Sequence, residues 1–172
     1  LSNITFSGNI GTAGGGMFNN YSSPILTNVY FTGNSNYYGG GGMYNVNSSP
    51  ILMNAIFYGN YGGGMQNTSS SPILINNSFI GNSSFAGGAI KNDFLSYPII
   101  RNSIFWGNTS TGYFYPQPPD DIYSTGWVDI SHSILQSPSS IYTNGFGLGA
   151  GMKYGTNPLF VNSSDPDGAD NI

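Results

Sequence analysis

One segment of this chain recurs at intervals of 22 to 26 residues, and this recurrence constrains the fold more than any other feature. Residues 23–34 read SPILTNVYFTGN, and residues 49–60 read SPILMNAIFYGN. Related copies occupy 71–82 and 96–108, and a partial copy opens the chain at 1–9. Self-similarity at such a period is typical of repeat architectures, in which each unit packs against its neighbours. The phenylalanines that the copies share are Phe6, Phe31, Phe57, Phe79 and Phe105.

Each repeat contains three short segments that favour β-strands. A glycine-rich run ends in an apolar residue, a Pro-Ile-Leu segment follows, and the third segment runs into Phe-x-Gly-Asn. Short apolar segments separated by Gly, Asn and Ser clusters predict strands joined by turns, and no stretch shows helical periodicity. Three strands in 22 to 26 residues fit one coil, so the sequence predicts an all-β fold, the right-handed parallel β-helix or β-solenoid.

The regularity of the repeat divides the chain into two parts. Residues 1–108 carry regular coils, and residues 109–172 carry irregular coils with long loops. The chain begins partway through a coil and stops without a closing element. We therefore interpret 109–172 as the truncated end of the same β-helix domain.

An asparagine recurs at the bend between the second and third segments of each repeat. Asparagine tolerates the left-handed backbone conformation that a sharp bend requires. On stacked coils its amide can donate to one neighbour and accept from the other, which predicts a hydrogen-bonded ladder. We expect these side chains to be structural, with Asn3 and Asn76 buried. The predicted ladder comprises Asn3, Asn28, Asn54, Asn76 and Asn102, and His132 takes the same position in the next repeat.

Comparison of the repeats separates an inner face from an outer face. Positions that keep their type should point inward, and positions that vary should point outward. The expected inner columns are the phenylalanines, then Leu26, Leu52, Leu74 and Ile100, then Met17, Met43, Met65 and Ile90. The outer columns include Ser7, Thr32, Tyr58, Ile80 and Trp106, and also Phe18, Tyr44, Gln66 and Lys91.

The composition argues against several classes of partner. Only 6 % of the residues are charged, the net charge is −4, and no cysteine is present. A nucleic-acid partner is not expected, because no basic surface is available to neutralise phosphates. We also expect no disulfide and no membrane-spanning helix, since no apolar run approaches the ~18 residues that such a helix needs.

The motifs resemble those of two groups of bacterial surface proteins. Gly-Gly-Ala-Ile at 87–90, together with Phe-x-x-Asn at 79–82, is similar to the repeats of polymorphic outer-membrane proteins, which are adhesins. The segments 103–108, 133–136 and 157–161 resemble the ending of right-handed β-helix domains in surface proteins of the choice-of-anchor type. The resemblance covers nearly the whole chain and implies an extracellular or cell-surface location. It leaves the activity open, because one fold carries many functions.

Residues suited to catalysis are sparse. A glycosidase needs two carboxylates at one sugar bond, and a pectate-type lyase needs carboxylates for calcium and a basic residue for the proton. Lys91, Asp93 and Arg101 belong to adjoining segments that could meet, where a surface ion pair is favoured over a catalytic group. The question of enzymatic activity stays open, with a non-catalytic protein favoured.

Two acidic groups are candidates for a cation. Asp165, Asp167 and Asp170 surround Gly168, and oxygen ligands on a glycine-containing turn suit calcium. The full calcium-loop spacing is absent there, and no other cofactor is expected. For the second group we favour solvated loop acids over a metal site: Asp120, Asp121 and Asp129.

The leading hypothesis is a non-catalytic structural or adhesive segment that displays its outward columns and loops. Exposed aromatic side chains suit carbohydrate stacking or an interface with another surface protein. Open coil edges could accept a second copy, which would give end-to-end fibres. The alternative is a carbohydrate-active enzyme, for which converging carboxylates in a groove would be the signature; a groove lined with Ser, Asn and Tyr would count against it. The predicted binding residues are Phe18, Tyr44, Tyr58, Trp106, Tyr113, Phe114 and Tyr115.

Overall fold

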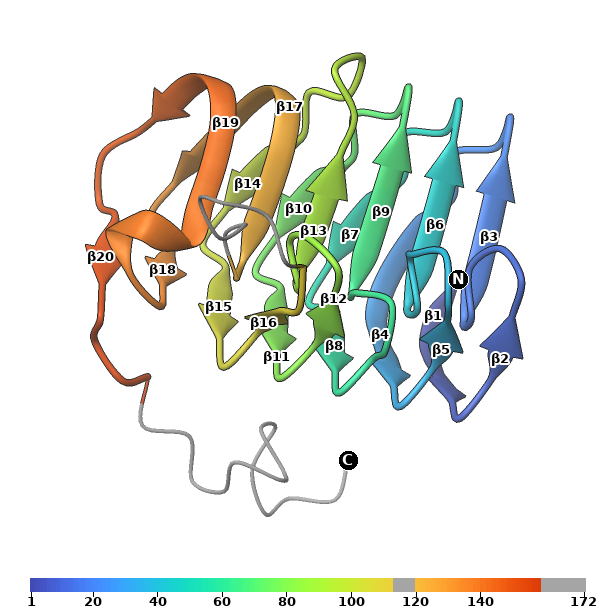
Figure 1. Ribbon diagram of the computed structural model, residues 1–172. Coiled ribbons are helices and arrows are strands. Elements are labelled where there is room, and N and C mark those ends of the chain that lie inside the picture. The colour runs from blue at the N-terminus through green and yellow to red at the C-terminus, as the bar shows by residue number, and fades with distance from the viewer. Residues whose placement is uncertain (113–119, 159–172) are drawn as a thin grey trace.

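The computed structural model describes residues 1–112 and 120–158, apart from the side chains of residues 144 and 146. The chain winds into stacked coils, and strands from successive coils lie side by side along the length of the molecule (Figure 1). Every strand pairing among these residues is parallel, and the predicted all-β parallel solenoid is confirmed.

Each of the three segments of the repeat builds its own row of parallel strands. The Met-x-Asn row comprises β3 (Met17–Asn20), β6 (Met43–Val46), β9 (Met65–Thr68), β13 (Ile90–Asn92), the start of β17 (Ile122–Ser131) and the start of β19 (Ile141–Leu148). The Ile-Leu row comprises the start of β4 (Ile25–Thr32), then β7 (Ile51–Met53), β10 (Ile73–Ile75), β14 (Ile99–Arg101) and the end of β17. The phenylalanine row comprises β1 (Ser2–Ser7), the end of β4, then β8 (Ile56–Tyr58), β11 (Ser78–Ile80), β15 (Ile104–Trp106), β18 (Ile134–Leu135) and β20 (Lys153–Tyr154).

Short strand pairs follow the phenylalanine row at the next corner of the coil. They are β2 (Ile10–Gly11) with β5 (Ser35–Asn36), and β12 (Ser83–Ser84) with β16 (Thr109–Ser110). Tyr61 joins this corner through bridges to Ser35 and Ser83. The one short helical turn of the described residues is a 3-10 helix at Pro138–Ser140.

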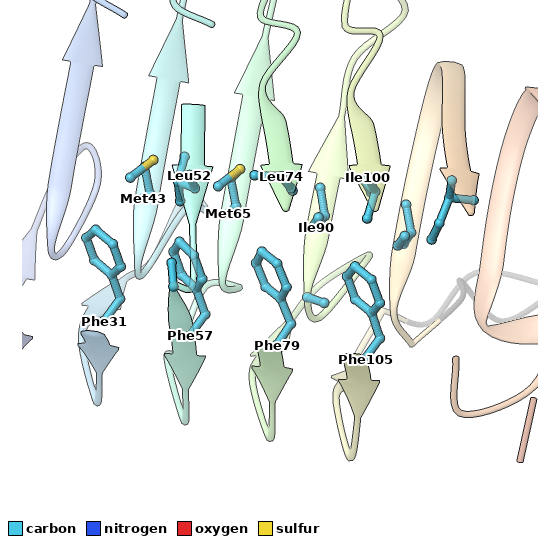
Figure 2. Close-up of a cluster of buried hydrophobic side chains, with 14 of the residues drawn as sticks. Phe31, Met43, Leu52, Phe57, Met65, Leu74, Phe79, Ile90, Ile100 and Phe105 are labelled. Atoms are coloured by element: carbon cyan, nitrogen blue, oxygen red, sulfur yellow. The ribbon is translucent and has the colours of Figure 1, made fainter. Parts of the chain in front are cut away.

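The phenylalanines form a continuous aromatic stack inside the coils (Figure 2). Ring centroids of successive members are 4.6 to 5.1 Å apart, and the rings are within 8° of parallel. This spacing follows from the strand separation of about 4.8 Å in a sheet, which places identical side chains directly above one another. The predicted inner columns are confirmed, and the fully buried members are Phe31, Phe57, Phe79, Phe105, Leu26, Leu52, Leu74, Ile100, Met43 and Ile90.

The predicted asparagine bend is confirmed, but the predicted burial of its side chains is wrong. Asn28 and Asn54 have φ of 54° and 55°, and His132 adopts the same conformation at 50°. Amide hydrogen bonds run from Asn28 to Asn3 at 3.1 Å and from Asn54 to Asn28 at 3.1 Å, so this ladder exists. Asn3 and Asn76 are nevertheless exposed, because the bend directs this row into an open groove on the outer surface.

A second asparagine ladder, which the sequence analysis did not identify, lies inside the coil. It is formed by the asparagine of Phe-x-Gly-Asn. The Oδ1 of Asn60 accepts from both the backbone and the side-chain nitrogen of Asn34, and its Nδ2 donates to Phe31 O and Asn82 Oδ1. All four hydrogen bonds are 2.8 to 3.1 Å long, so the buried amide is fully satisfied. The row comprises Asn9, Asn34, Asn60, Asn82 and Asn108 and ends on the carboxylate of Asp121.

A third ladder follows the Met-x-Asn strands. Each Nδ2 donates to the next Oδ1 at 2.7 to 2.8 Å, from Asn19 through Asn45 and Asn67 to Asn92. The next residue in register is Ser124, whose side chain is too short to continue the row. The Nδ2 of Asn92 is therefore buried without a partner, and the ladder stops there.

One outward column is more buried than its position suggests. Ile80 points away from the phenylalanine stack, yet only 5 % of its surface is exposed. It lies in register between Tyr58 on one coil and Trp106 on the other. Large neighbours in an outer row shield an apolar side chain between them, so the expectation of an exposed Ile80 is wrong.

The two kinds of asparagine ladder should differ strongly in their contribution to stability. Replacing Asn60 with alanine removes four hydrogen bonds and leaves buried groups unsatisfied, which we expect to cost about 3 kcal/mol or more of unfolding free energy. Replacing the exposed Asn54 with glycine keeps the left-handed bend accessible and should cost less than about 1 kcal/mol. Urea denaturation of both variants measures the difference. Equal losses would contradict the structural role assigned to the inner ladder.

Candidate functional site

The predicted aromatic binding residues fall on different outer rows. Phe18 on β3 and Tyr44 on β6 are neighbours, with ring centroids 5.6 Å apart and a tilt of 40°. Tyr58 and Trp106 lie on the phenylalanine row, where they are half-buried around Ile80. The structure therefore does not gather these four aromatic residues into one site. Tyr113, Phe114 and Tyr115, like Asp165, Asp167 and Asp170, lie outside the described residues.

The outer asparagine ladder lines a groove of about 460 Å³ that crosses successive coils. The side chains that line it repeat from coil to coil, as the strand register requires. Among the described residues that line it, none carries a carboxylate, an imidazole or an amine. The groove thus offers amides, hydroxyls and one aromatic ring, but no acid–base pair. Its lining residues are Asn3, Thr5, Asn28, Tyr30, Asn54, Ile56, Asn76 and Ser78.

A second concave feature, which we call the tyrosine notch, has a volume of about 320 Å³. Its origin is a difference in loop length between coils. Residues 35–42 join Asn34 to Met43, and residues 83–89 join Asn82 to Ile90, but only residues 61–64 join Asn60 to Met65. The short connection leaves a gap between the longer loops on either side. The lining residues are Tyr37, Tyr38, Tyr61, Gly62, Ser84, Phe85, Lys91 and Thr111.

The notch is held open by backbone packing that only glycine allows. Gly62 has φ of 90°, and a Cβ there would collide with the carbonyl oxygen of Asn36. Asn36 in turn accepts a hydrogen bond from the backbone nitrogen of Tyr38 at 2.8 Å, which fixes the start of the longer loop. The rings of Tyr37 and Tyr38 meet edge to face, with centroids 5.4 Å apart. These contacts hold both tyrosines at the rim.

The sequence analysis missed the tyrosine notch, although the sequence carried a signal. The phenylalanine spacing falls to 22 residues between Phe57 and Phe79, against 25 or 26 elsewhere. A coil with fewer residues must have a shorter connection between two of its strands, and here that connection is 61–64. Aromatic residues occur in this connection and in the two that flank it. Tyr37 and Tyr38 lie in a connection between repeated motifs, so they belong to no column that recurs from repeat to repeat.

The predicted meeting of Lys91, Asp93 and Arg101 is wrong. The Nη2 of Arg101 pairs with Asp129 Oδ2 at 2.6 Å, on the neighbouring coil. The carboxylate of Asp93 accepts from the backbone nitrogens of Ser69 and Leu95 and from the hydroxyl of Ser96. Its role is to organise the corner after β13, and it does not form a catalytic group with the two basic residues.

The acids at 120, 121 and 129 do not form a cation site. Within 1–112 and 120–158, no cluster of three Asp, Glu, His or Cys side chains could hold a metal ion. Asp120 Oδ1 accepts from the backbone nitrogen of Ser110 at 2.9 Å, and Asp129 pairs with arginine. Asp121 is fully buried, so the expectation of a solvated loop acid is wrong for this residue.

Burial raises the pKa of the Asp121 carboxyl above its ordinary value, and the charge of Asp120 adds to the rise. Hydrogen bonds donated by Ser140, Asn108 and the backbone of Gln136 oppose the shift, because they favour the charged form. The distance from Ser140 Oγ to Asp121 Oδ2 is 2.6 Å. Asp121 therefore ends the inner ladder as an acceptor for several donors, and its charge state is linked to folding.

Comparison with known proteins adds no family assignment. A scan against protein-family models, a search of curated proteins and a search of solved structures each found no match to this chain. In the part of the chain that the structure describes, no helix has the length and apolar character needed to cross a membrane.

The buried Asp121 should make stability fall as pH rises. Because its pKa is raised in the folded state, the folded chain keeps a proton that the unfolded chain has lost once pH exceeds about 4. Stability should decrease with pH up to the raised pKa and then level off. Asp121→Asn should flatten this dependence, whereas Ser140→Ala should extend it to higher pH by removing a donor. Urea midpoints measured from about pH 4 to about pH 8 test both changes; a wild-type midpoint that rises through this range would contradict the linkage.

Proposed function

We propose that this chain is a non-catalytic β-solenoid segment that displays binding surfaces to a partner outside the cell or on its surface. The observation that carries the proposal is the tyrosine notch. Tyr37, Tyr38 and Tyr61 have 82 %, 78 % and 55 % of their surface exposed around one concave site. Exposed aromatic rings are costly to leave in water unless a partner covers them, so their clustering supports a binding role.

The stacked coils suit such a role because they hold surface groups at fixed spacing. The inner ladders and the phenylalanine stack connect every regular coil to the next. Side chains on the outer surface are thus attached to a rigid support. Because the surface is already rigid, binding of a partner costs little conformational entropy of the protein, which favours recognition.

The groove of the outer ladder supports a non-catalytic interpretation over the carbohydrate-active enzyme. Hydrolysis of a glycoside requires two carboxylates at the scissile bond, and a lyase requires a base. The described lining has amides, hydroxyls and the phenol of Tyr30, and it has none of the carboxylates that glycoside hydrolysis or calcium binding by a pectate-type lyase would use. The enzyme remains an alternative for surfaces outside the groove, and a turnover assay distinguishes the two.

The cell-surface location and the adhesive role rest on the resemblance to polymorphic outer-membrane and choice-of-anchor proteins. A chain with 6 % charged residues, no cysteine and a regular solenoid is compatible with export. End-to-end association of copies into fibres stays a prediction. Electron microscopy of the purified chain tests it, with filaments as the supporting result and separate short rods as the contrary one.

Screening the purified chain against an array of glycans and cell-surface proteins tests the proposed function. We expect saturable binding to at least one class, with no change in the chain length of any bound polysaccharide after prolonged incubation. Shortening of a bound polysaccharide, detected by size-exclusion chromatography, would replace the adhesive proposal with the enzyme. Failure to bind any glycan or protein would also count against display as the function.

A further inference from the structure

We propose that the tyrosine notch is a binding site for an acidic saccharide, a sugar that carries a carboxylate or a sulfate. This inference rests on the proposed function, since it names the ligand class for a chain that binds rather than cleaves. It joins three observations: the shape of the notch, the exposed tyrosines at its rim, and an uncompensated lysine in its lining.

The notch has the dimensions of a small-molecule site. Its volume of about 320 Å³ lies at the lower end of the range that ligand pockets occupy. A stable protein interface typically involves about 20 to 30 residues on each partner, whereas eight described residues line the notch. The space between two loops of neighbouring coils therefore suits one or a few sugar rings better than a protein surface.

The tyrosines supply the kind of contact that a sugar ring makes. The C–H face of a pyranose packs on an aromatic ring, while the phenol hydroxyl remains able to hydrogen-bond. Tyr37 and Tyr38 present rings at nearly perpendicular angles, 87° apart, and Tyr61 comes from the short coil between the loops. Ser84 and Thr111 also line the site, but their hydroxyls donate to the backbone oxygens of Ala86 and Ser84, so the phenol groups are the hydroxyls that a ligand would meet. The lining thus combines apolar faces with hydroxyl groups.

The charge of Lys91 selects for an acidic ligand. The chain has three Lys and Arg residues in total, and Arg101 is already paired with Asp129. Lys91 lines the notch, and no acidic side chain of the described residues forms an ion pair with it. A carboxylate or sulfate that enters the notch would meet an uncompensated positive charge beside aromatic rings. In a chain of net charge −4, such a local cation offers electrostatic complementarity for an anion.

Titration calorimetry with three oligosaccharides of equal length tests the proposal: one with uronate carboxylates, one with sulfates, and one neutral. We expect the uronate or the sulfated probe to bind at least tenfold more tightly than the neutral one, with affinity that falls as salt increases. The probe that binds more tightly identifies which anion the notch prefers. Lys91→Gln should weaken acidic binding about tenfold and remove the salt dependence, whereas Lys91→Arg should retain most of it.

Aromatic variants separate the notch from the rest of the surface. The double variant Tyr37→Ala with Tyr38→Ala should weaken binding of acidic and neutral probes alike by tenfold or more. Tyr97→Ala is the matched control, because Tyr97 is a similarly exposed tyrosine, at 51 %, that does not line the notch. We expect this control to bind as the wild type does. Thermal denaturation of each variant verifies that the fold is retained.

The outcomes distinguish this inference from the proposed function. Binding of acidic probes that none of the notch variants weakens would overturn the assignment of the site, while leaving a binding role intact. Preference for the neutral probe, or binding only to a protein, would overturn the ligand class. Absence of binding to all three probes would overturn the ligand class in every case. A protein partner found in the array would then leave the proposed function standing, and the absence of any partner would remove both.

Discussion

The inner asparagine ladder is the interaction on which the rest of this structure depends. A parallel coil must turn at each corner, and a buried corner leaves backbone groups without strand partners. The amide of Asn60 satisfies two such groups, Asn34 N and Phe31 O, while joining three coils through its own row. The phenylalanine stack, the strand register and the outer surface all require that these corners lie directly above one another.

The sequence predicts the fold well because each repeat can be compared with the other repeats of the same chain. Residues that keep their type, such as Phe57 and Leu52, could be placed inside without knowledge of the structure. The same comparison wrongly predicted that the row containing Asn3 and Asn76 is buried. A sharp bend and a buried ladder both require asparagine in every repeat, so the recurrence of the residue does not separate the two. Only the three-dimensional path shows that Asn60 faces inward and Asn54 outward.

The candidate site could be predicted only in part, for a related reason. Alignment of the repeats identifies Phe18, Tyr44, Tyr58 and Trp106 as outward residues. It cannot place residues in connections of variable length, because these have no equivalent in the other repeats. The tyrosine notch arises from such a variation, because a short coil between two longer ones opens a gap. A coil of unusual length in an otherwise regular solenoid thus indicates where the surface has a concave site. The partner of Arg101, 28 residues away in sequence, likewise depends on the path of an irregular coil.

The direction of the amide hydrogen bonds gives the rod an electrical polarity. Along the inner ladder each side-chain amide accepts at its oxygen from the amide of the earlier coil and donates one N–H to the amide oxygen of the later coil, so the amide dipoles add head to tail with their positive ends toward Asp121. The arrangement resembles the alignment of peptide dipoles in a helix, whose positive end attracts anions. The carboxylate of Asp121 is located at that positive end. The third ladder donates in the same direction, from Asn19 toward Asn92. The exposed ladder donates in the opposite direction, from Asn54 to Asn28 to Asn3, so its dipoles oppose those of the two buried rows along the rod.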